Sequence, residues 1–268
     1  MATQHERFCF RTLDELRQRI AELGLDLPLA EDWSPLAKPV AVGPLRTPNA
    51  IAIHPMEGCD GTTDGRPGEL TIRRYERFAR GGAGLLWFEA TAIMPEARAN
   101  PRQLTLTEAN LPAFRDLLEH TLDVARQESG PDFRPLTVLQ LTHSGRYAKP
   151  AGTPAPIIAQ HDPLLDPRTG VQPEQAPITD EELAALPARY VQAARLAREA
   201  GFDAVDVKSC HRYLLSELLA AHTRPGPYGT SYEGRTRLLL ETVARLRAEV
   251  PGILVAVRLN AYDGPPYP

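Results

Sequence analysis

Compact apolar segments alternate along most of the chain with longer segments in which apolar residues recur every three or four positions. The compact segments are almost wholly apolar, which is typical of parallel strands covered by helices. We therefore expect a parallel α/β sheet in which strands and helices alternate. The expected strands are residues 51–56, 84–91, 136–141, 201–208 and 253–259.

A helical period is present between the expected strands and before the first of them. Thr179 and Glu182 stand at the spacing of a capping box, so one helix should begin there. Pro187 falls inside that helix and predicts either a local kink or a break between two helices. The expected helices are residues 11–23, 70–80, 107–127, 179–200, 213–221 and 233–250.

The first 48 residues form a separate region in this interpretation. Residues 25–48 are rich in proline, so we expect an extended arm after the first helix. Residues 49–268 then form one domain, because this length is close to the roughly 250 residues of a single α/β barrel. Residues 147–178 have no period, and a loop of that length usually covers an active site or is disordered.

Composition narrows the classes of function. The net charge of −4 provides no basic surface for nucleic acid, and no run approaches the roughly 18 apolar residues of a membrane helix. The N-terminus lacks the apolar core of a signal peptide. The cysteines Cys9, Cys59 and Cys210 lie far apart, without zinc or disulfide spacing, and we expect Cys59 and Cys210 to be small buried residues. These features predict a cytoplasmic protein that binds neither nucleic acid nor membrane.

Reactive side chains gather where the strand of residues 201–208 ends. Lys208, His211 and Tyr213 follow one another there, and barrel enzymes place their chemistry at the carboxyl ends of parallel strands. The alternative is that these are ordinary polar residues at the surface. Arg258 is a lone charge in an apolar strand, so we expect it to have a fixed anionic or polar partner.

Histidines at other strand ends leave a second class of function open. His54, His143 and the Lys208–His211 cluster follow three strands, so a metal-dependent barrel hydrolase is an alternative. No HxH pair follows the first strand to support it. No GxGxxG follows that strand either, so a Rossmann dinucleotide site is not indicated.

Several short motifs lie in a fixed order, each at an expected strand end. They are HPMEG at 54–58, GGAGLLWFEAT at 81–91, LQLTHSGR at 139–146, YLLSELL with YGTSYEGRTR after residue 212, and VRLN at 257–260. Together they resemble the Old Yellow Enzyme family of FMN-dependent oxidoreductases, over roughly residues 49–260. The resemblance implies a TIM-type (β/α)8 barrel that holds FMN at the carboxyl ends of its strands and uses NAD(P)H as reductant.

The resemblance also implies which residues contact the flavin. Gln140 matches the glutamine that hydrogen-bonds the pyrimidine edge of the ring. Arg258 matches the arginine near N1 and the C2 carbonyl, where a fixed positive charge favours the anionic reduced flavin. The positions implied for the flavin site are Pro55, Met56, Glu57, Ala90, Gln140 and Arg258.

For catalysis the resemblance implies reduction of an activated C=C bond, of the enone or dienoyl type, in a small molecule. Lys208 and His211 fall where the family keeps a pair that grips the substrate oxygen, which favours negative charge developing there. Tyr213 matches the family's tyrosine, which gives a proton to one carbon while hydride from the flavin reaches the other.

Some positions depart from the family pattern. Lys208 stands where histidine or asparagine is common, and Arg212 replaces a glycine. Gly234 replaces an asparagine, and Glu57 stands where many members carry threonine, cysteine or alanine. These changes bear on the substrate and the flavin potential more than on the fold.

The end of the sequence is the largest departure, because the family's barrel has eight strands and this sequence stops after the fifth. We therefore expect an incomplete barrel over residues 49–268, as a fragment, a truncated reading frame or one part of a split protein. The alternative function is a non-catalytic remnant that needs another segment. The expected assembly is a homo-oligomer or a complex with a missing C-terminal segment, because an open barrel leaves strand edges unpaired.

Overall fold

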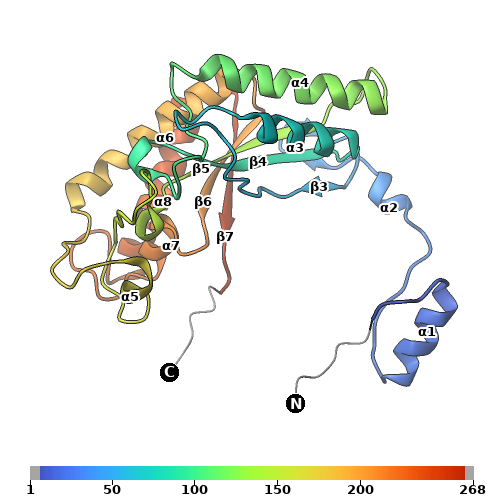
Figure 1. Cartoon of the computed structure of the whole chain (residues 1–268), viewed down its shortest axis with the longest axis horizontal. Helices are drawn as coiled ribbons and strands as arrows, with labels where there is room; N and C mark the ends of the chain where they lie inside the picture. The colour runs from blue at the N-terminus through green and yellow to red at the C-terminus, as the bar shows by residue number, and fades with distance from the viewer. Residues whose placement is uncertain (1–6, 263–268) are drawn as a thin grey trace.

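The computed structural model describes residues 7–262, and its centre is one parallel sheet (Figure 1). The five strands pair in the order in which they occur in the sequence, which is the arrangement of a barrel wall. The prediction of a parallel α/β sheet is therefore confirmed. The strands are β3 (Ala52–Ile53), β4 (Leu85–Ala92), β5 (Leu136–Thr142), β6 (Ala204–Ser209) and β7 (Leu254–Leu259).

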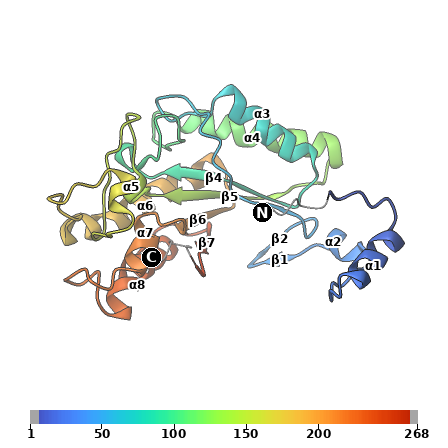
Figure 2. The same ribbon diagram turned by 60° about the horizontal axis from the view of Figure 1, so that its bottom comes forward.

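Helices cover the outer face of this sheet. α3 packs on α4, and α6 packs on both α4 and α8; Figure 2 shows α3 and α4 lying together above the strands. The main core lies between these helices and the outward side chains of the strands, such as Val205 and Val207. The helices are α3 (Glu69–Arg80), α4 (Leu111–Ser129), α6 (Asp180–Ala200), α7 (Leu214–Leu219) and α8 (Tyr232–Glu249).

A smaller apolar cluster fills the amino-terminal end of the inner face. Leu136, Val138 and Ala204 form it, and partly buried side chains from neighbouring strands pack against it. Val42 joins the cluster from a hairpin of β1 (Ala41–Val42) and β2 (Leu45–Arg46). Because this end is apolar, polar chemistry on the inner face is confined to the carboxyl ends of the strands.

The region before the barrel has more structure than an extended arm. Within residues 25–48, where an extended arm is expected, the chain forms α2 (Ser34–Ala37) and the antiparallel β1–β2 hairpin. The expected first helix is present as α1 (Leu13–Glu22), capped by Thr12, whose side chain accepts from the Glu15 N–H. Figure 1 shows α1 set apart from the body of the molecule, and none of its residues is buried.

Proline explains two differences in the helices. α4 begins at Leu111 rather than at Thr107, because Pro112 has no N–H to donate and is tolerated only in a first turn. α6 continues through Pro187 without a break, so the alternative of two helices is wrong. Thr179 and Glu182 form the expected capping box.

The long segment of residues 147–178 is folded onto the barrel and contains α5 (Asp166–Thr169). Ile158 and Ala159 are fully buried in it, so the alternative of a disordered loop is wrong. Short 3₁₀ turns flank the neighbouring strand ends, η1 (Pro95–Ala97) after β4 and η2 (Gly145–Tyr147) after β5.

Candidate functional site

Polar side chains meet on the inner face at the carboxyl ends of β5, β6 and β7. Gln140 on β5 is in register with Asp206 on β6, and Lys208 is in register with Arg258 on β7. Side chains two residues apart on a strand share a face, so Asp206 and Lys208 point inward while Val207 points into the outer core. The period of the strands therefore gathers these polar groups at one place.

Glu57 connects two of the catalytic candidates. Its Oε1 accepts from Lys208 Nζ at 2.7 Å and from the Tyr213 hydroxyl at 3.3 Å. Lys208 Nζ also lies 3.9 Å from the centroid of the Tyr213 ring, within cation–π distance. Burial raises the pKa of Tyr213, and the Glu57 carboxylate beside it raises that pKa further, so the phenol keeps its proton. The structure thus brings Lys208 and Tyr213 together around a carboxylate.

The turn after β6 that leads to Tyr213 has an unusual backbone conformation at two residues. His211 and Arg212 have left-handed φ angles of 62° and 58°, which are uncommon for residues with a side chain. Tyr213 then caps α7, so its position is fixed by the start of that helix. His211 is exposed, and its ring lies edge-on to the ring of Tyr213 with centroids 6.5 Å apart.

Asp206 is a site residue that sequence reasoning missed. Its Oδ2 accepts from Gln140 Nε2 at 2.5 Å and from Trp87 Nε1 at 3.1 Å, so it holds the amide of Gln140 in place. Its Oδ1 is buried without a partner among the described residues, and burial raises the pKa of this carboxyl. A charged residue inside the apolar run AVDV was the available signal, the same kind that identified Arg258.

The remaining flavin candidates line the same end of the sheet. Arg258 Nη1 donates to the Pro55 carbonyl at 3.4 Å, which provides the polar partner expected for it. Pro55 is buried, whereas Met56 is 52% exposed. Ala90 is fully buried, and its carbonyl accepts from Gln103 Nε2 at 3.0 Å.

A buried ion network anchors the loop that carries Glu57. Arg74 pairs with Asp60 and with Glu89, and the other oxygen of Glu89 accepts from the Gly58 N–H at 3.0 Å. A Cβ at Gly58 would lie 1.7 Å from Arg74 Nη1, so glycine is required there to leave the guanidinium in place. This network holds the loop after β3 against α3 and β4.

A second buried network joins the long loop to α7. Arg146, whose side chain is fully buried, pairs with Asp166 and donates to Glu217 Oε1 at 2.7 Å. Asp166 also contacts His161 Nδ1 at 2.7 Å. Because α7 begins directly after Tyr213, this network fixes the loop and the turn of His211 and Tyr213 relative to each other.

Glu217 predicts a pH-dependent contribution to stability. Its pKa is raised to about 7 by burial, against an ordinary value of ~4.3 in an unfolded chain. Between those values the folded state binds the extra proton, so this group lowers the free energy of unfolding as the pH rises. We expect Glu217→Gln to remove this slope, so that between pH 5 and pH 8 the Tm of the variant improves relative to wild type by about 2–6 °C. Thermal unfolding at both pH values measures it, with the exposed Glu108→Gln as control. Parallel changes in wild type and variant would contradict it.

The structure also bears on the two cysteines expected to be buried and on the alternative of a metal site. Cys210 is buried, but Cys59 is exposed, so the prediction of a buried Cys59 is wrong. Cys59 lies in a turn with φ 52°, where its Sγ accepts from Asn100 Nδ2 at 3.0 Å. Within residues 7–262 no three His, Cys, Asp or Glu side chains are grouped as metal ligands, so the hydrolase alternative gains no support.

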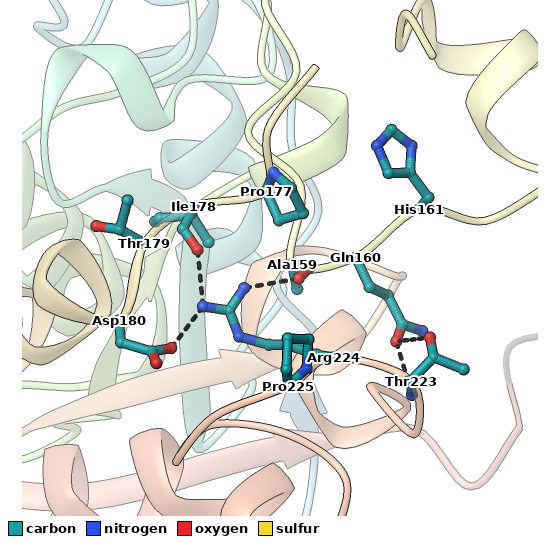
Figure 3. A pocket seen from close by; sticks show the side chains of 10 residues that line it. All are labelled: Ala159, Gln160, His161, Pro177, Ile178, Thr179, Asp180, Thr223, Arg224 and Pro225. Atoms are coloured by element: carbon teal, nitrogen blue, oxygen red, sulfur yellow. Dashed lines mark hydrogen bonds and ion pairs between the residues drawn. The ribbon is translucent and has the colours of Figure 1, made fainter. Parts of the chain in front are cut away.

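A hollow of about 470 Å³ lies beside the long loop, and Figure 3 shows the residues that line it. Arg224 connects two walls of the hollow, because its buried guanidinium joins the long loop to the start of α6. Its three acceptors, each at 2.7 Å, are the carbonyls of Ala159 and Ile178 and Oδ1 of Asp180. None of the residues assigned to the flavin or to catalysis lines this hollow.

Comparison with known proteins identifies what the chain is similar to. Residues 35–265 match the profile of the NADH:flavin oxidoreductase / NADH oxidase family. An NADPH dehydrogenase of Halalkalibacterium halodurans is 29% identical over 225 residues, with 80% of this chain and 60% of the relative covered. A 12-oxophytodienoate reductase 1 of Oryza sativa is 28% identical, with 85% and 59% covered.

The solved structures agree with the sequence comparison. An Old Yellow Enzyme from Pichia sp. superimposes with a TM-score of 0.71 at 27% identity, over 89% of this chain and 63% of that one. The chain therefore spans about 60% of the length of these relatives. In the part of the chain that the structure describes, no helix has the length and apolarity needed to cross a membrane.

Proposed function

Because the chain belongs to the NADH:flavin oxidoreductase / NADH oxidase family, we propose that it forms the catalytic face of an FMN-dependent oxidoreductase that uses NAD(P)H to reduce an activated C=C bond. The observation that carries the proposal is the convergence of Lys208 and Tyr213 on one inner sheet end, beside Gln140 and Arg258. The similar rice protein is a 12-oxophytodienoate reductase by name, which favours a conjugated carbonyl compound as substrate.

The residues at the strand ends fit a planar, polar-edged ring. Gln140 and Asp206 offer hydrogen-bonding groups, including the buried Asp206 Oδ1 that lacks a partner among the described residues. Arg258 offers a guanidinium with five N–H donors, of which Nη1 makes a long bond of 3.4 Å to the Pro55 carbonyl. Ala90, on the strand between β3 and β5, contributes only a methyl group. These residues would hold FMN, which when bound supplies the hydride taken from NAD(P)H.

The chain's own residues would bind the substrate oxygen and supply the proton. The Lys208 ammonium has three N–H donors and uses one for Glu57, so it can also hold a substrate carbonyl oxygen and stabilise negative charge there. His211, exposed beside Tyr213, would supply the second contact to that oxygen. The Tyr213 hydroxyl, kept protonated by its surroundings, donates the proton to the substrate carbon after rotating away from Glu57.

The proposal is tested first by flavin binding. We expect the purified chain to bind FMN with quenched fluorescence and to oxidise NADPH when 2-cyclohexenone is added. Arg258→Met should weaken FMN binding by about 10- to 100-fold, because a charge-assisted hydrogen bond contributes about 1.5–3 kcal/mol. The exposed Arg247→Met on α8 is the matched control. A wild-type chain that binds no FMN would favour the non-catalytic remnant instead.

A further inference from the structure

We propose that Glu57 determines the charge of the substrate that this site accepts. By neutralising Lys208 it makes the site favour an uncharged carbonyl compound over a carboxylate of the same shape. This inference rests on the proposed function, because it takes Lys208 to be the group that contacts the substrate oxygen. It assigns to Glu57 a role in specificity in addition to its expected place beside the flavin.

The contact crosses the interior of the sheet. Glu57 follows β3 and Lys208 lies near the carboxyl end of β6, with two strands between β3 and β6 in the sheet, yet their charged atoms are 2.7 Å apart. The Lys208 side chain is only 2% exposed, whereas Glu57 is 19% exposed. A buried ammonium is costly without a counter-charge, and Glu57 is the carboxylate that supplies it.

The N–H donors of Lys208 explain how the Lys208–Glu57 pair would favour a neutral ligand over a carboxylate. One N–H is directed at Glu57, and the ammonium also lies over the Tyr213 ring, so a free donor remains for a single neutral oxygen. A carboxylate ligand would have to share this ammonium with the carboxylate of Glu57, and two like charges that close repel each other. Rejection by such repulsion is a general means of specificity.

The other charged groups nearby do not replace this effect. Arg258, in register with Lys208, is directed at the Pro55 carbonyl and belongs to the proposed flavin edge. Arg212 lines a separate small hollow with Arg146 and Glu217. Asp206, which also points inward, accepts from Gln140 and Trp87, and His211 lies beside Tyr213, so Glu57 is the carboxylate in direct contact with Lys208.

Paired ligands of equal shape test the proposal. Benzamide is neutral and benzoate is anionic, and their dissociation constants are measured by NMR titration of the chain without added flavin. Wild type should bind benzamide at least about tenfold more tightly than benzoate, since like-charge juxtaposition costs several kcal/mol. Glu57→Gln should bind benzoate at least about tenfold more tightly than wild type does, with benzamide little changed.

Two further variants make the result decisive. Glu57→Asp keeps the charge and should keep the preference for benzamide, which a merely structural role of the glutamate would not predict. Glu108→Gln removes an exposed charge elsewhere and should bind both probes as wild type does. An unchanged benzoate-to-benzamide ratio in Glu57→Gln, or no binding of either probe to any variant, would overturn the inference. FMN titration of the same proteins reports on the proposed function separately, so loss of FMN binding with a retained shift in probe preference would overturn only that function.

Discussion

Tyr213→Phe is expected to lower the rate of 2-cyclohexenone reduction by roughly 10²- to 10⁴-fold, the usual contribution of a positioned general acid. The variant removes one hydroxyl, whose contacts are to the Glu57 carboxylate, and leaves the Lys208–Glu57 pair and the aromatic ring in place. Hydride transfer to the alkene then lacks its partner proton, while binding of FMN and its reduction by NADPH need no proton from Tyr213. Stopped-flow measurement of the two half-reactions separates these effects.

Tyr147→Phe is the matched control for this variant. The ring of Tyr147 lies 5.9 Å from that of Tyr213, so it shares the surroundings without sharing the contact to Glu57. In the Tyr147→Phe variant, the rate at which 2-cyclohexenone oxidises the reduced enzyme should stay within about threefold of wild type, because a substitution without a specific role usually changes free energies by no more than about 0.5 kcal/mol. An equal loss in both variants, or an undiminished rate in Tyr213→Phe, would remove Tyr213 from the proposed role.

The sheet and its inward-facing polar residues could be predicted from the sequence for one physical reason. Strands buried on both faces are continuous apolar runs, so a charge inside such a run must be facing something polar. That reasoning identified Arg258, and it applies equally to Asp206, which was overlooked; the cluster at Lys208 was found from its place at a strand end. Period and burial thus locate inward-facing polar groups before any coordinates are known.

Contacts between distant strands could not be predicted in the same way. Glu57 and Lys208 are 151 residues apart, and their pairing depends on how the sheet curves rather than on local pattern. The same holds for Arg74, which reaches Asp60 and Glu89 from a neighbouring helix. Proline usually interrupts a helix, but at Pro187 tertiary packing outweighs this tendency. The buried face of α6 keeps the helix continuous despite a missing hydrogen bond.

Arg146→Met is expected to lower the free energy of unfolding by about 3–5 kcal/mol, the cost of removing one partner from a buried ion pair. The Arg146 side chain is fully buried, and its guanidinium binds Glu217, Asp166 and the Gln160 carbonyl. Without it, Glu217 is left buried, with only the backbone N–H groups of residues 159 and 160 as partners. Urea unfolding followed by tryptophan fluorescence and circular dichroism measures the change.

The double variant Arg146→Met/Glu217→Met distinguishes this cause from a general loss of packing. Replacing both ions by apolar side chains of similar volume is often neutral or stabilising, so the double variant should recover more than half of the lost stability. The exposed pair of Arg80 and Glu76 is the control, since Arg80→Met should cost less than about 1 kcal/mol. If the double variant is no more stable than Arg146→Met, the guanidinium stabilises the loop through its carbonyl contact and packing rather than through Glu217. Because α7 carries the Tyr213 turn at its start, recovery of stability should be accompanied by recovery of FMN binding in the same samples.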